Sequence, residues 1–174
     1  MSAILYRTAE LTPGAGRTVH GIAVPYGQVA EVSDGGPTYR ERFEYGAFRR
    51  SIAERGHKIR LFGNHATRQF PVGKAVDLRE ERDGLHAAFE IVATRDGDDA
   101  LELVRSGTVD SFSVGFTGIR EHRDNGVVVR TEASLREVSL TALPAYAGAM
   151  VHGVRSQLVI PRSIAEARLS LLDW

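Results

Sequence analysis

Two long segments around one turn decide the fold of this chain: Ser111–Arg123 (SFSVGFTGIREHR) and Val127–Leu143 (VVVRTEASLREVSLTAL), joined by Asp124-Asn125-Gly126. Both are rich in β-branched and aromatic residues, and Asn-Gly is a strong hairpin signal, so they predict two long antiparallel strands. Five shorter runs that precede them predict further strands. These are Thr18–Tyr26, Tyr39–Phe43, Ile59–Phe62, Val72–Leu78 and Leu85–Val92, the last two joined through Asp83-Gly84.

Helical periodicity predicts about three helices at the periphery of this sheet. Apolar residues spaced by three or four predict helices over Tyr45–Glu54 and Asp98–Arg105, each followed by a glycine. Near the end, Ser163-Ile164-Ala165-Glu166 matches a capping box, which predicts a terminal amphipathic helix within residues 161–174. Because strands do not alternate with helices, a doubly wound parallel sheet is disfavoured. We expect one domain over residues 1–174, with a core of about 18–151: a mainly β (α+β) fold, a largely antiparallel barrel or sandwich flanked by helices.

Composition and charge disfavour several classes of function. The formal net charge of +0 gives no electrostatic footprint for nucleic acid, so we expect no nucleic-acid partner. The chain has no cysteine, which removes cysteine nucleophiles, disulfides and thiolate metal sites. It has no signal-peptide core and no run approaching about 18 apolar residues, so we expect a soluble, cytosolic protein without a membrane partner.

The hairpin also predicts which polar side chains share a face of the sheet. A two-residue loop would pair residues whose numbers add up to 251 and place Ser113 and Glu137 on opposite faces of the sheet. We expect instead a three-residue loop over residues 124–126, which would pair residues whose numbers add up to 250 and place Ser113 directly opposite Glu137. This register separates polar from apolar residues. One face would carry Ser111, Ser113, Glu137, Ser139 and Thr141, and the other Phe112, Val114, Val138, Leu140 and Ala142.

A serine, a histidine and a carboxylate are the side chains needed for nucleophilic acyl transfer. Ser113 and Glu137 are candidates, and His65 follows the apolar run ending at Phe62. Each has a structural alternative: Ser113 as an ordinary strand residue, His65 as a structural or exposed histidine, and Glu137 as the ion-pair partner of an arginine. Ser111 is the rival nucleophile. The arginine paired with Glu137 would be Arg130 or Arg136. Lys74 is the candidate lysine for a different catalytic arrangement, a Ser-Lys dyad. A catalytic zinc is disfavoured because the six histidines lack ligand spacing, and no metal or cofactor is expected.

The chain resembles the prohead protease family of HK97-type tailed phages, which is related to the herpesvirus assembly proteases. The resemblance covers about residues 18–151. It rests on several motifs: GIAVPY at 21–26, Asn64-His65, PVGK at 71–74, DGL at 83–85, GTVDSFSVGF at 107–116, LREVSL at 135–140 and LPAYA at 143–147.

This resemblance implies a herpesvirus-protease-like β-barrel with Ser113 as nucleophile and His65 as base. The phage pattern favours Glu137 as third member, whereas the herpesvirus relatives use a second histidine. Here that histidine would be one of His20, His57, His86, His122 or His152. The implied function is a serine endopeptidase that cleaves scaffold segments of the capsid protein, and itself, inside the procapsid in the bacterial host cytoplasm.

Two other functions remain open: a non-catalytic β-barrel assembly or binding module of the procapsid, and an esterase-like hydrolase. The terminal helix, Ser163 to Leu172, carries a leucine face that would be buried either in a homodimer or against the chain's own barrel.

Overall fold

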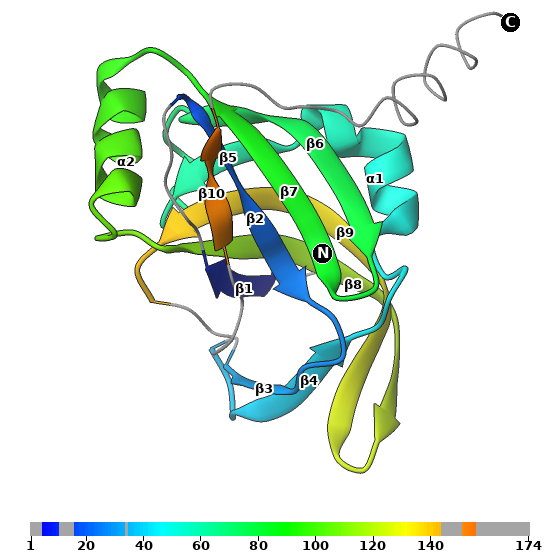
Figure 1. The fold of residues 1–174 in the computed structure, drawn as a ribbon. Helices are drawn as coiled ribbons and strands as arrows, with labels where there is room; N and C mark the ends of the chain where they lie inside the picture. Colours follow the sequence, from blue (N-terminus) through cyan, green and yellow to red (C-terminus); the bar gives the residue numbers. More distant parts are fainter. Residues whose placement is uncertain (1–4, 11–15, 34, 144–150, 156–174) are drawn as a thin grey trace, which may run out of the picture.

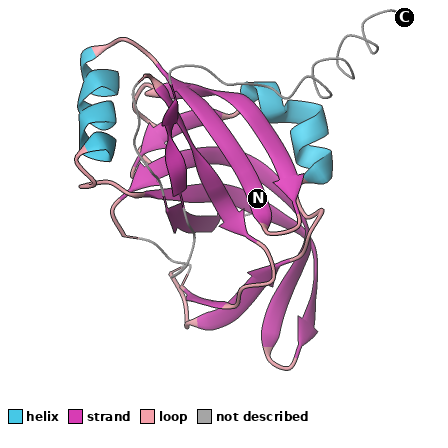
Figure 2. Cartoon of the chain, viewed as in Figure 1, coloured by secondary structure: helices cyan, strands magenta, loops and turns pink. Residues whose placement is uncertain are grey.

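The computed structural model describes residues 5–10, 16–33, 35–143 and 151–155, and most of them lie in strands (Figures 1 and 2). The strands are β1 Leu5–Glu10, β2 Thr18–Pro25, β3 Ala30–Val32, β4 Tyr39–Phe43, β5 Arg60–Gly63, β6 Gly73–Glu81, β7 Gly84–Ile91, β8 Ser111–Asp124, β9 Val127–Thr141 and β10 Val151–Arg155. The helices are α1 Arg49–Arg55, the 3-10 turn η1 Gly56–Lys58 and α2 Arg95–Arg105. Within the described residues, no helix has both the length and the apolar character needed to span a membrane.

One curled sheet contains all of these strands. Its order is β1-β8-β9-β5-β6-β7-β2-β10, with β3 and β4 attached beside β9. The sheet curls until β1, at one end of the order, contacts β2 near the other end, which gives the half-barrel seen in Figure 1. Helices α1 and α2 lie at opposite sides of it (Figure 2). The expected fold class, mainly β with peripheral helices, is confirmed.

The sheet is largely antiparallel, but β9 pairs in parallel with both β4 and β5. Strand β9 therefore lies in the interior of the sheet, between the antiparallel β8 and the parallel β5. Central strands are buried on both faces, and this one carries Leu135, Val138 and Leu140 into the apolar core. The same strand also buries Glu137 and Ser139, at 4% and 0% exposure, so their polar groups require partners inside the protein.

The predicted register of the β8–β9 hairpin is wrong in detail. The loop is Asn125-Gly126, two residues with positive φ (48° and 80°), because Asn-Gly suits the tight type I′ turn. Irregularities between the turn and the site then shift the pairing, so that Ser113 lies opposite Ser139 and Glu137 lies opposite Gly115. Near the site, the partner of each residue is displaced by two positions from the predicted one, and an even displacement leaves each side chain on its predicted face of the sheet. The predicted separation of polar and apolar faces therefore holds.

The predicted element ends also need correction. Helix α1 begins at Arg49 rather than Tyr45, because the chain turns at Gly46 with a φ of +93°. Helix α2 begins at Arg95 rather than Asp98, because the Thr94 hydroxyl caps it by accepting the Gly97 N–H at 3.3 Å. The predicted terminal helix and the leucine face proposed for a homodimer lie outside the described residues.

Candidate active site

Three neighbouring strands bring the predicted site residues together. Strand β8 carries Ser113, the central strand β9 carries Glu137, and His65 follows the end of β5. Because β9 lies between the other two, side chains on one face of these strands converge over it. The site is thus built from segments separated by up to 72 residues in the sequence.

A tight turn directs His65 back over the sheet. Strand β5 runs beside β9 up to the pair Gly63 and Leu140, and the Asn64 N–H then donates to the Leu140 carbonyl at 2.9 Å. Asn64 and His65 have φ values of 47° and 57°, and the Ala66 N–H donates to the Gly63 carbonyl at 3.0 Å. Positive φ at both central residues with this hydrogen bond defines a type I′ turn. Two residues in left-handed backbone cost free energy, which is typical of functional sites.

The three side chains form a continuous hydrogen-bonded chain. His65 Nε2 lies 2.6 Å from Ser113 Oγ, and His65 Nδ1 lies 2.6 Å from Glu137 Oε1. An ionised carboxylate only accepts hydrogen bonds, so the imidazole proton lies on Nδ1 and Nε2 accepts from the serine hydroxyl. The side chain of Glu137 is 5% exposed and that of His65 21%. This is the arrangement in which a histidine can take the proton of a serine hydroxyl.

A fourth residue, whose contacts the sequence did not predict, completes the site. The Ser139 hydroxyl donates to Glu137 Oε2 at 2.7 Å and accepts the backbone N–H of His65 at 3.1 Å. Both oxygens of the buried carboxylate therefore have a donor, which offsets the free-energy cost of burying its charge. The available signal was the Glu-Val-Ser spacing, since residues two apart in a strand share a face.

The alternative partners of these residues are engaged elsewhere. Ser111, the rival nucleophile, donates to Asp110 Oδ1 at 2.7 Å. Lys74 forms an ion pair with Glu90 at 2.9 Å, and Arg136 donates to the Thr117 hydroxyl at 3.1 Å. Arg130 binds Glu41, Glu121 and Tyr39. Glu137 lies beside His65 Nδ1, the position of the third triad member. In the herpesvirus-type alternative, a second histidine would take this position.

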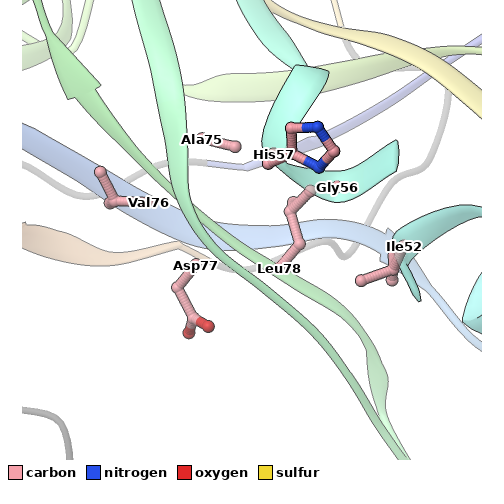
Figure 3. Close-up of a pocket in the computed structure, with 7 residues that line it drawn as sticks. All are labelled: Ile52, Gly56, His57, Ala75, Val76, Asp77 and Leu78. Atoms are coloured by element: carbon pink, nitrogen blue, oxygen red, sulfur yellow. The ribbon is translucent and has the colours of Figure 1, made fainter. Parts of the chain in front are cut away.

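One hollow of about 240 Å³ lies apart from these residues, between α1, η1 and β6. Its lining is mostly apolar, with Ile52, Ala75 and Leu78, and it includes His57 but none of the three site residues. Figure 3 shows the Asp77 carboxylate pointing away from the His57 ring, so the two do not form a second acid–base pair there.

Comparison with known proteins identifies the family of this chain. Residues 4–163 match the profile of the caudovirus prohead serine proteases. The chain belongs to this family. A curated relative, the prohead protease of Enterobacteria phage HK97, is 30% identical over 115 residues, which cover 64% of this chain and 51% of the relative. The chain thus spans about half the length of that relative.

A solved structure shares the fold of this chain. The bacteriophage T4 capsid assembly protease superposes with a TM-score of 0.60 at 12% sequence identity, covering 82% of this chain and 98% of that one. At this identity the likeness concerns the fold alone. The predicted resemblance to the prohead protease family is confirmed by the profile match.

Proposed function

We propose that this chain is a serine endopeptidase that matures a phage procapsid, with Ser113 as nucleophile, His65 as general base and Glu137 as the orienting carboxylate. One observation carries the proposal: the unbroken hydrogen-bonded chain from Ser113 Oγ through the His65 imidazole to Glu137. Membership of the prohead protease family supports the peptide bond as the substrate. The chemistry uses only the peptide and water, and no cofactor takes part.

The steps follow from the positions of the protons. As Ser113 Oγ attacks the peptide carbonyl carbon, its proton passes to His65 Nε2, and Glu137 stabilises the imidazolium that forms. The imidazolium then protonates the leaving amine, the C–N bond breaks and an acyl-serine remains. Water, deprotonated by Nε2, attacks the acyl carbon and releases the acid, and the serine regains its proton.

Ser113 is only 1% exposed in this structure. A substrate carbonyl must come within bonding distance of its Oγ, so peptide binding requires a local displacement of the residues that cover the serine. Family membership supports the substrate class of this proposal: segments of the capsid protein that act as scaffold, and the protease itself, inside the procapsid in the bacterial host cytoplasm.

The direct test is co-expression of the chain with the capsid protein of its own phage, followed by intact-mass analysis. We expect truncation of the capsid protein by the wild type and by Ser111→Ala, but none by Ser113→Ala. Truncation that persists in Ser113→Ala would reject this nucleophile. No truncation in any sample would favour the alternative function, a non-catalytic assembly module. Turnover of small esters without peptide cleavage would instead indicate the esterase.

A further inference from the structure

Ser139 occupies a position that joins two parts of the site. It lies on β9 directly opposite Ser113, is 0% exposed, and is paired in parallel register with Phe62 of β5. Its hydroxyl donates to the Glu137 carboxylate and accepts the backbone N–H of His65. One small side chain therefore contacts both the orienting acid and the backbone of the base.

We propose that Ser139 is a positioning residue of this active site, acting on His65 through Glu137. The inference rests on the proposed function. Ser139 Oγ holds Glu137 Oε2, which fixes the carboxylate plane and leaves Oε1 aimed at His65 Nδ1. Ser139 Oγ also accepts the backbone N–H of His65, whose φ lies in the left-handed region. The imidazole is therefore held in position both through the His65 backbone and through its ring nitrogen.

Removal of the hydroxyl would disturb both contacts at once. In Ser139→Ala the buried Glu137 Oε2 loses the hydroxyl that donates to it, and the His65 N–H loses the hydroxyl oxygen that accepts from it. A carboxylate with one free oxygen can rotate away from Nδ1, and the imidazole would then spend less time aligned with Ser113. Hydrogen bonds to charged groups of this kind correspond to about a 10- to 100-fold change in rate.

The test is the rate at which a fluorophosphonate, a general probe for activated serines, labels the purified full chain. Wild type should be labelled and Ser113→Ala should not. Ser139→Ala should be labelled about 10- to 100-fold more slowly, while Ser139→Thr, which keeps a hydroxyl, should recover part of the loss. The matched control is Ser111→Ala, another fully buried serine on the same face, which should be labelled at the wild-type rate.

A double-mutant cycle separates positioning from a general structural effect. In a Glu137→Ala background the contact of Ser139 with the carboxylate is already gone and only its contact with the His65 backbone N–H remains, so Ser139→Ala should slow labelling by less than about threefold. Its full 10- to 100-fold cost in that background would overturn the inference, as would wild-type labelling of Ser139→Ala. Absence of labelling in the wild type would instead reject the proposed nucleophile, and this inference with it.

Discussion

The charge on Glu137 is the most informative single feature to remove. Glu137→Gln keeps the size of the side chain, but it replaces a carboxylate that accepts two hydrogen bonds with an amide that has one acceptor oxygen. His65 Nδ1–H and the Ser139 hydroxyl, at 2.6 and 2.7 Å, would then compete for that oxygen. When His65 is protonated in the transition state, its positive charge would face a neutral group.

The expected loss of labelling rate in Glu137→Gln follows from the distance between the two charges. At a charge separation of about 4 Å and an effective dielectric constant of about 20, the ion pair is worth about 4 kcal/mol, or roughly a 10³-fold change in rate. A lost hydrogen bond to a charged group adds about 1.5 kcal/mol, close to a further tenfold. We therefore expect Glu137→Gln to be labelled by a fluorophosphonate about 10⁴-fold more slowly. This agrees with the loss of about 10⁴ in kcat for the same change in a Ser-His-Asp triad.

The matched control is Glu80→Gln. Glu80 is another buried carboxylate, which accepts from the Tyr26 hydroxyl at 2.7 Å and from the Phe48 N–H at 2.8 Å, away from the three site residues. It should lower the free energy of unfolding and leave the labelling rate of the folded protein within about threefold of wild type. If Glu137→Gln were labelled as fast as Glu80→Gln, Glu137 would not orient the base and the third position of the triad would be open again.

Three further predictions concern stability, measured by urea unfolding. Burial raises the pKa of Tyr26 above its ordinary value of 10.0, so above that pH the unfolded chain releases a proton that the folded chain keeps. Stability should thus fall by about 1.4 kcal/mol per pH unit from this group, and Tyr26→Phe should lack that part of the slope. Arg130→Met, which removes the ion-pair partner of the fully buried Glu41, should cost about 3–5 kcal/mol, and a further Glu41→Leu should recover much of it. Gly97→Ala should cost about 1–3 kcal/mol because its Cβ would clash with the backbone carbonyl oxygen of Val92, whereas Gly36→Ala, with open space around it, should stay within about 0.5 kcal/mol.

The sequence predicted β2 and β4 to β9 because their signals are local, and it missed β1, β3 and β10. Alternation, aromatic and β-branched residues, and the Asn125-Gly126 turn lie within a few residues of what they specify. The position of His65 is different. It depends on a parallel pairing between β5 and β9, whose paired residues are 77 positions apart, such as Leu61 and Val138, and on a type I′ turn that no apolar pattern encodes. Only the family resemblance connected His65 with Ser113 before the structure did.

The contacts of Ser139 and Arg130 show a second limit to what can be predicted from the sequence. A buried polar residue must find a partner, but its sequence neighbours do not say which one. Arg130 was a candidate partner for Glu137 and instead pairs with Glu41, 89 positions away, while Ser139 takes one oxygen of Glu137. Partners of this kind depend on which strands lie side by side, and that is fixed by the whole sheet.

The corrected register has a chemical consequence. Directly opposed residues in an antiparallel pair have Cβ atoms about 4.5–5.5 Å apart, too close for an imidazole to fit in line between their side chains, whereas diagonal neighbours lie about 7–8 Å apart. The shifted pairing places Ser113 opposite Ser139 and diagonal to Glu137. That wider gap is the one His65 spans with two hydrogen bonds of 2.6 Å. The irregularities in the hairpin thus place Ser113 and Glu137 at the wider, diagonal separation, across which His65 connects them.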